Sequence, residues 1–166
     1  MTLLDAPKFD TARDRRRRIV IYSTVSFIGV FTLGFWLAAG MPFDWPWTWN
    51  THRTGLITVD RFLRAVEKND LTQAYGIWWH DKDWQQHPQK YADYSFPRFQ
   101  SDWGPDSSEN DYGAIKSHIF KAAHMYGNVL VVGALINGRK SKPLFLDYDP
   151  STHTLGYSPV EYYLSP

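Results

Sequence analysis

The sequence predicts an α+β domain that follows a single hydrophobic helix. Three observations lead to this: an uncharged apolar run over residues 19–41, helical periodicity between residues 58 and 104, and extended segments from residue 112 onward. Helices that precede consecutive antiparallel strands are typical of the α+β class. We therefore expect an N-terminal transmembrane helix followed by a helical hairpin packed on a curved four-stranded antiparallel sheet.

Residues 19–41 form the predicted membrane span. This stretch has no charged side chain and is rich in Ile, Val, Phe and Leu. At about 1.5 Å per residue, a helix of this length crosses the roughly 30 Å hydrocarbon core of a bilayer with some tilt. The sequence therefore predicts a single-pass membrane protein.

The distribution of basic residues predicts the orientation of this span. The arm of residues 1–18 contains six Lys or Arg and three Asp, including the run from Arg15 to Arg18. The other flank has Asp44 and no basic residue before Arg53. By the positive-inside rule, residues 1–18 are a cytoplasmic basic arm and the C-terminal domain is extracytoplasmic, as in a bacterial inner-membrane protein that faces the periplasm.

Other interpretations of the apolar run stay open. Ala38, Ala39 and Gly40 are small residues at which a signal peptidase could cut. A signal peptide usually has an apolar region of about 7 to 15 residues, however, and this one is longer. The paired arginines match a twin-arginine signal poorly. Gly34 and Ala38 form a small-xxx-small pair through which two copies of the helix could meet as a homodimer.

Residues 42–57 are predicted to form an aromatic and proline-rich stalk. Phe43, Trp45, Trp47 and Trp49 alternate with residues that include Pro42 and Pro46, in a form that cannot continue a helix. Tryptophans directly after a span are typical of the aromatic belt at a membrane interface. The alternative is that these tryptophans pack onto the globular domain.

The globular domain is predicted to occupy residues 58–166 and to begin with two helices. Thr58 is the expected N-cap of the first helix, and Asn69 and Asp70 interrupt the pattern so that Asp70 can cap the second. Apolar residues recur at helical spacing on one face of each helix. These residues are Val59, Phe62, Leu63 and Val66 in the first helix, and Leu71, Ala74, Tyr75 and Trp78 in the second.

A third short helix and four strands are predicted to complete the domain. Ser95 can cap the third helix, which carries Phe96, Phe99 and Trp103 before Gly104 ends it. Turn signals then separate extended segments, and Asn137-Gly138 is the strongest of them because a two-residue type I′ turn needs positive φ at both positions. The predicted strands are residues 113–125, 129–136, 142–148 and 154–163.

Composition excludes several functions. Outside the basic arm the chain has a net charge of −2, which argues against a nucleic-acid partner because phosphate binding needs clustered Lys and Arg. The chain has no cysteine, which excludes disulfides, thiolate metal sites and Cys nucleophiles. It also has no Gly-rich phosphate loop and no Gly-x-Ser-x-Gly elbow, which argues against nucleotide hydrolysis and serine-hydrolase chemistry.

The segment VDRFLRAVEKNDLTQAYGIW, a third helix and four strands together are similar to the nuclear transport factor two-like superfamily, a cystatin-like α+β cone. The resemblance covers residues 58–164 and rests on Phe62, Ala65, Asn69-Asp70 and Ala74-Tyr75. It implies a cone-shaped domain with a pocket between helices and sheet. Members of the superfamily include isomerases, dehydratases, accessory subunits and interaction modules, so the fold alone cannot choose among these functions.

Candidate metal ligands gather in the loop that follows the second helix. His80, Asp81, Asp83 and His87 have the side chains that bind zinc, but their spacing matches no established zinc motif. A solvated polar loop is the interpretation that we favour, and we expect neither a metal nor another cofactor.

Candidate acids and bases are few. His118 and His124 are six residues apart on one predicted strand, so we expect them to share a face with Phe120. Tyr75, His118 and Asp147 are the nearest match by residue type to the carboxylate or His and Tyr donors of superfamily enzymes. No family motif assigns a catalytic role to any of these residues.

These observations favour a membrane-anchored extracytoplasmic binding or assembly module. The expected partners are the lipid bilayer and either a partner protein or a second copy of the chain. The alternative is a small-molecule isomerase or dehydratase that uses the cone pocket. A pocket holding a shielded His or Asp beside a Tyr would favour the enzyme, whereas an interior without a buried ionisable pair would favour the binding module.

Overall fold

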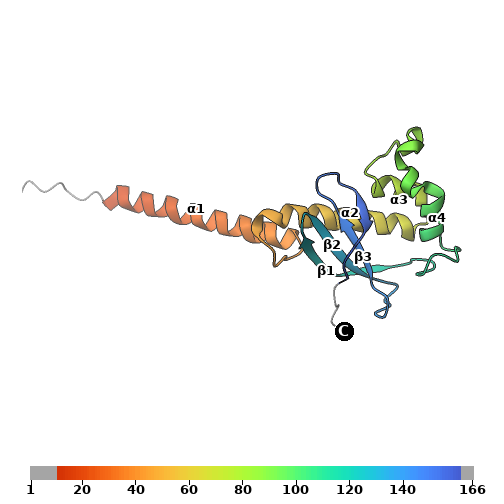
Figure 1. Cartoon of the computed structure of the whole chain (residues 1–166). Helices are drawn as coiled ribbons and strands as arrows, with labels where there is room; N and C mark the ends of the chain where they lie inside the picture. Colours follow the sequence, from red (N-terminus) through yellow and green to blue (C-terminus); the bar gives the residue numbers. More distant parts are fainter. Residues whose placement is uncertain (1–10, 162–166) are drawn as a thin grey trace, which may run out of the picture. The chain divides into compact units, whose positions relative to one another are not determined.

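The computed structural model describes residues 11–161 and divides into two compact units, one ending at Ala38 and the other beginning at Ala39 (Figure 1). The first unit contains helix α1, Thr11–Ala38. Helix α1 is long and apolar enough to cross a membrane, and a signal sequence near an N-terminus has the same properties. Residues 1–10 of the predicted arm lie outside the described residues.

The end of α1 differs from the predicted span. The helix stops at Ala38, whereas the apolar run continues to Met41. Gly40 and Met41 both have positive φ, of 83° and 55°, which a right-handed helix cannot accommodate. The chain therefore leaves the helix within three residues of the predicted boundary.

Helix α2, Trp49–Glu67, begins well before the predicted start at Thr58. Thr58 is no N-cap, because it lies inside the helix and its hydroxyl donates a hydrogen bond to the Thr54 carbonyl over 2.8 Å. The predicted stalk of residues 42–57 is therefore wrong from residue 49 onward. A single-turn 3₁₀ helix, η2 at Pro46–Thr48, precedes α2. Pro42 and Pro46, which disfavour a regular helix interior, both lie before the first residue of α2.

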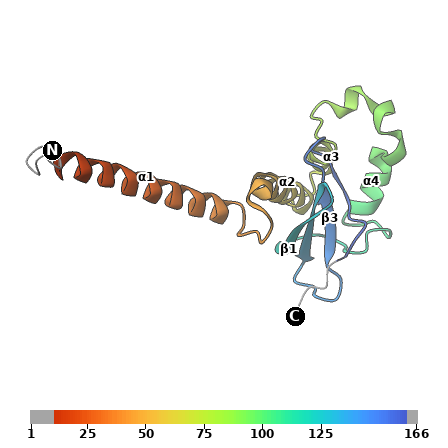
Figure 2. The same ribbon diagram turned by 60° about the vertical axis from the view of Figure 1, so that its left-hand side comes forward.

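The interruption between the first two helices of the domain was predicted correctly. Asn69 adopts positive φ, and the Asp70 carboxylate accepts a hydrogen bond of 2.9 Å from the Gln73 amide at the start of α3, Leu71–Trp78. Helix α2 contacts α3 and the first three strands, and α3 contacts the fourth strand. In Figures 1 and 2 the strands cross beside α2, and in Figure 1 α3 lies near the C-terminal end of α2.

Short helical turns occupy much of the predicted polar loop. The 3₁₀ helices η3, Trp84–Gln86, and η4, Pro88–Tyr94, precede α4, Phe96–Trp103. Ser95 occupies the N-cap position of α4 as predicted, but its side chain makes no capping hydrogen bond. Pro97 in the first turn suits a helix start because its missing N–H would have no partner there.

The sheet is four-stranded and antiparallel, with the strands in sequence order. The α+β class and this sheet are therefore confirmed. The first strand begins five residues later than predicted. The last ends at Tyr157, and residues 162–163 of its predicted range lie outside the described residues. The strands are β1, His118–Tyr126; β2, Val129–Ile136; β3, Leu144–Tyr148; and β4, Leu155–Tyr157.

The Asn137-Gly138 turn has the predicted backbone but does not close a tight hairpin. Both residues have positive φ, and the Arg139 amide donates a 3.0 Å hydrogen bond to the Ile136 carbonyl. Strand β3 starts only at Leu144, so a longer loop separates β2 and β3. The Asn137 side chain instead accepts hydrogen bonds from the Lys116 and Ser117 amides and ties the start of β1 to this turn.

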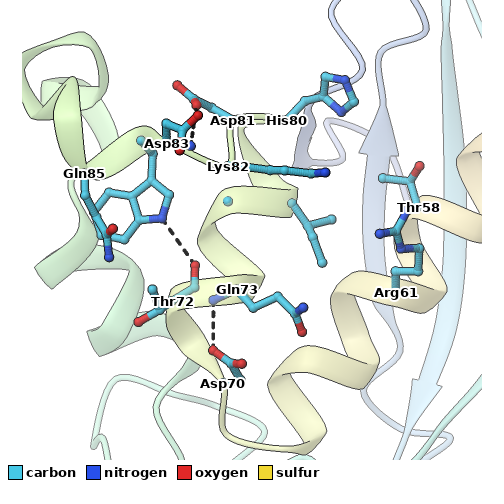
Figure 3. A pocket seen from close by; sticks show the side chains of 13 residues that line it. Thr58, Arg61, Asp70, Thr72, Gln73, His80, Asp81, Lys82, Asp83 and Gln85 are labelled. Carbon is cyan, nitrogen blue, oxygen red and sulfur yellow. Dashed lines mark hydrogen bonds between the residues drawn. The ribbon is translucent and has the colours of Figure 1, made fainter.

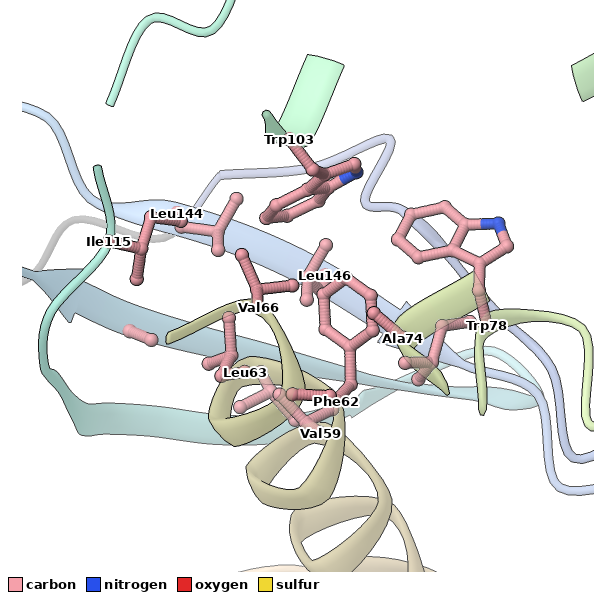
Figure 4. Packing of buried hydrophobic residues seen from close by; sticks show 14 of the residues in the cluster. Val59, Phe62, Leu63, Val66, Ala74, Trp78, Trp103, Ile115, Leu144 and Leu146 are labelled. Carbon is pink, nitrogen blue, oxygen red and sulfur yellow. The ribbon is translucent and has the colours of Figure 1, made fainter. Parts of the chain in front are cut away.

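The core lies between α2, α4 and the inner face of the sheet (Figure 4). Phe62 is fully buried and contacts the rings of Trp78, Phe99 and Trp103. Leu146 of β3 belongs to the same cluster. Aromatic side chains, including Phe99 and Trp103 of α4, fill this region.

Candidate functional site

A polar groove of about 720 Å³ lies between α2 and the segment that contains α3 and the following loop. Figure 3 shows the side chains of α2 on one side of the groove and those of α3 and the loop on the other. Its lining includes Thr58, Arg61, Gln73, His80, Lys82 and Trp84.

Two local structures hold the α3 side of the groove in place. The Asp70 cap fixes the first turn of α3, from which Gln73 reaches the groove. The indole N–H of Trp84 donates a 3.3 Å hydrogen bond to the Thr72 carbonyl, which folds the loop back onto the helix. A Cβ at Gly76 would lie 3.0 Å from the Asp81 carbonyl oxygen, so this close approach favours glycine.

The acidic and basic side chains of the groove differ in their contacts. Asp81 accepts hydrogen bonds from the Tyr91 hydroxyl and the Asp83 amide, and Lys90 lies 3.9 Å from it. The hydrogen bond from Tyr91 is the largest cause that lowers the pKa of the Asp81 carboxyl. In contrast, neither Arg61 nor Lys82 forms an ion pair with any residue in the described part of the chain.

The chemistry of the groove follows from these contacts. Arg61 offers a planar set of N–H donors and Lys82 offers an ammonium group, while Gln73 adds a carboxamide. The Asp70, Asp81 and Asp83 carboxylates line the same groove, and the hydrogen bonds that Asp70 and Asp81 accept come from uncharged donors. Arg61 and Lys82 can each pair with a carboxylate or phosphate of a polar ligand, while the three carboxylates can accept hydrogen bonds from its donors.

The candidate metal ligands do not assemble into a metal site. His80, Asp81 and Asp83 line the groove, whereas His87 does not. The His80 ring lies 5.1 Å from the ring of His153, and the Asp81 carboxylate is occupied as described above. Over residues 11–161, no group of three or more His, Asp or Glu side chains is placed to hold a metal ion.

The three acid–base candidates lie in separate surroundings. Tyr75 is buried in the core and donates a 2.6 Å hydrogen bond to the Tyr94 carbonyl. His118 lies at the start of β1 beside α2. Asp147 pairs with Val131 and Gly156 on the outer face of the sheet, where burial raises the pKa of its carboxyl.

His118 and His124 do not share a face of the sheet, so that prediction was wrong. A β-bulge between Phe120 and Ala122 inserts an extra residue and reverses the alternation of side chains along β1. His118 pairs with Ile136 on the core face, and His124 pairs with Val131 on the opposite face. Counting by two along the strand could not reveal this insertion.

His118 instead links β1 to the charged face of α2. Its Nδ1 lies 2.7 Å from the Glu67 carboxylate and its Nε2 lies 3.2 Å from that of Asp60. The Arg64 side chain also contacts Asp60 over 2.8 Å. Each nitrogen of the imidazole faces a different carboxylate, so this cluster fastens a strand to a helix.

A second polar cluster, which sequence patterns did not predict, joins α4 to β4. The Tyr94 hydroxyl donates to the Asp102 carboxylate over 2.8 Å and lies 3.1 Å from the Tyr157 hydroxyl. Burial is the main cause that raises the pKa of both phenols, that of Tyr157 to about 12, so both stay protonated at neutral pH. Arg98 also contacts Asp102 over 3.1 Å, so every charge in the cluster has a partner.

Comparisons with protein-family models, with curated proteins and with solved structures found no match to this chain. The groove residues that sequence analysis missed are Arg61, Gln73 and Lys82. Their only sequence signal is that polar side chains flank the break at Asn69-Asp70 on both sides, and that pattern equally fits ordinary solvated helix faces.

Proposed function

We propose that this protein is a membrane-anchored extracytoplasmic binding module. Helix α1 is the anchor, and the unit that begins at Ala39 presents the polar groove to a partner. The observation that carries the proposal is the pair of cations Arg61 and Lys82, which have no ion-pair partner in the described chain.

The proposed ligand is an acidic segment of a partner protein. A groove open along α2 and α3 suits an extended segment, and Arg61 and Lys82 supply two points at which its carboxylates can pair. Charge pairs of this kind at an interface mainly set specificity and the rate of association. The partner should therefore bind less tightly as the salt concentration rises.

The three residues that the sequence singled out give no support to the alternative of an isomerase or dehydratase, although Asp102 beside Tyr94 is a carboxylate–phenol pair of the kind expected for it. Tyr75, His118 and Asp147 lie in three different surroundings, and aromatic side chains occupy the region where a catalytic pocket was expected. A general acid and base must both reach the same substrate. The described part of the chain places none of these three residues within reach of another.

The finer architecture is also our proposal. The order of helices before four consecutive antiparallel strands supports a nuclear transport factor two-like arrangement, with α2 and α3 acting as one helical hairpin on the sheet. Dimerisation through the outer sheet face is less well supported. On that face Val131, Leu135 and Phe145 are already buried, with exposures of 0%, 6% and 7%.

Site-specific photo-crosslinking in host membranes tests the proposed groove. A photoreactive residue at position 73 of the full-length chain should give one discrete protein adduct. The double variant Arg61→Glu/Lys82→Glu should lose most of this adduct, because reversed charges repel an acidic segment. The matched control Lys121→Glu/Lys140→Glu changes the net charge equally at exposed positions outside the groove and should keep the adduct. Equal adduct yields from the two double variants would contradict the proposal.

A further inference from the structure

The residues just after α1 expose a concentrated set of large apolar side chains. Met41, Phe43, Trp45 and Trp47 have exposures of 53%, 94%, 69% and 75%. The rings of Trp45 and Trp47 stack on each other with centroids 5.0 Å apart and planes 3° apart. We call these four residues the aromatic platform. In contrast, Trp78 and Trp103 of the same compact unit are almost fully buried, with exposures of 3% and 2%.

The aromatic platform is fixed to the folded unit through Asp44. The Asp44 carboxylate contacts the buried His52 imidazole over 2.7 Å and accepts a hydrogen bond of 3.3 Å from the Met125 amide of β1. The Trp49 indole N–H also donates to the Asp44 carbonyl over 3.1 Å. Because Asp44 points inward between Phe43 and Trp45, the alternating chain holds the platform side chains outward.

The turn η2 stiffens the same segment. The amide and hydroxyl of Thr48 both donate to the Trp45 carbonyl, over 2.9 Å and 2.7 Å. Pro46 restricts the backbone between the two stacked tryptophans. The hydrogen bonds of Asp44 and Thr48 therefore fix the backbone of the platform, while its four side chains face outward.

The position of the platform along the chain indicates what covers it. From Ile19 to Ala38 a helix rises about 30 Å, which is the thickness of the hydrocarbon core. Met41 then falls where the polar interface of the bilayer begins, and Trp side chains are enriched at this depth because their rings are amphipathic.

We propose that the aromatic platform is a membrane-interface surface that lies in the headgroup layer of the bilayer. The inference rests on the proposed membrane anchor and adds that the unit beginning at Ala39 is held at the membrane surface through Asp44. A flexible stalk would let this unit move away from the bilayer, whereas a clamped platform keeps β1 and α2 close to it.

Depth measurement by spin labelling tests this proposal on the full-length chain. Since the chain has no cysteine, single-cysteine variants take a nitroxide label without background. The variant Trp47→Cys reports on the platform. The control Ile119→Cys labels an exposed position on β1 that lies six residues, about 20 Å, from Met125. Val30→Cys, an exposed position of α1, reports on the anchor itself.

The three labels are compared in vesicles of phosphatidylcholine and phosphatidylglycerol. We expect the collision rate with a water-soluble nickel chelate to be several-fold lower at position 47 than at position 119, and lowest at position 30. Equal rates at positions 47 and 119 with a shielded position 30 would overturn the platform but leave the anchor standing. Free access of the chelate at position 30 would overturn both.

A second copy or a partner protein on the platform would give a different result. Shielding by a second copy would weaken as the protein is diluted in lipid and would bring spin–spin broadening at position 47, which would overturn the membrane-interface proposal. The variant Asp44→Ala tests the clamp. It should increase the mobility of the label at position 47, and unchanged mobility would contradict the role of Asp44.

Discussion

Phe62 shows how single residues of α2 determine the packing of the domain. Its ring lies 5.4 Å from that of Trp78, 6.2 Å from that of Phe99 and 4.9 Å from that of Trp103. Three different helices thus meet at one side chain of the core. The buried stripe of α2 was predicted from helical spacing alone, because apolar residues three and four positions apart fall on one face of any helix.

Phe62→Ala is expected to destabilise the protein severely. Replacing a buried Phe by Ala typically costs about 3 to 5 kcal/mol through lost burial and the cavity that remains. Urea unfolding of the full-length chain in detergent micelles, followed by near-ultraviolet circular dichroism, measures this loss. Arg64→Ala is the control on the exposed face of the same helix and should leave the unfolding midpoint nearly unchanged. Equal tolerance of both substitutions would show that the stripe faces no core.

His52 connects stability to pH. Burial lowers the pKa of its imidazole, with a smaller contribution from nearby His124, while the hydrogen bond and charge of Asp44 oppose the shift. The unfolded chain then binds a proton at His52 at a higher pH than the folded chain does, so stability falls as the pH drops below about 6.5. Unfolding midpoints at about pH 7.5 and about pH 5.5 should differ more for the natural chain than for His52→Gln. The same pH dependence in both chains would count against this assignment.

At the scale of elements, periodicity predicted the existence of the helices and strands better than their ends. Helix α2 starts nine residues before Thr58, and its first turns pack against the sheet through Gly55. The early start was not predicted because the apolar periodicity of residues 49–57 is weak. The bulge in β1 and the long loop before β3 depend on contacts that are distant in sequence. Short-range patterns cannot contain that information.

Gly55 marks the closest approach of α2 to the sheet. A Cβ there would lie 2.6 Å from Leu130 and 2.9 Å from Tyr148, both of which are buried. Overpacking of this kind typically costs about 1 to 3 kcal/mol, which exceeds the gain of about 0.5 to 1 kcal/mol from replacing a helical glycine by alanine. Gly55→Ala should therefore lower the unfolding midpoint, whereas Arg53→Ala, at an exposed position of the same helix, should not. A higher midpoint for Gly55→Ala would mean that α2 lies farther from the sheet.

At the scale of the whole molecule, sequence analysis predicted the apolar helix and the mixed fold but missed the groove. The apolar helix is visible because lipid requires a long uncharged run, and the α+β class is visible because helices precede strands. The groove arises where the loop folds back through Trp84 and Thr72. Its cations Arg61 and Lys82 lie on different elements, and only the fold brings both of them to one groove.

The orientation of the chain in the membrane is the last prediction. Four of the six basic residues of the N-terminal arm form the run from Arg15 to Arg18, directly before the apolar stretch. Basic residues beside a span are retained in the cytoplasm, so the groove and the aromatic platform should face the other compartment. Alkaline phosphatase fused after Pro166 and expressed in a bacterium should be active, because the enzyme needs an oxidising compartment to form its disulfides.

The control for this prediction replaces Arg15, Arg16, Arg17 and Arg18 by Ser, which removes the charge asymmetry and should reduce the activity of the fusion at equal protein level. A fluorescent protein that folds only in the cytoplasm, fused at the same site, should behave in the opposite way. An inactive phosphatase together with a fluorescent fusion would place the C-terminal unit in the cytoplasm and contradict the proposed orientation. A mature chain that begins near Met41 would instead identify α1 as a cleaved signal sequence. The aromatic platform would then lack an adjacent anchor, and only its own contacts with lipid could hold the unit at the membrane.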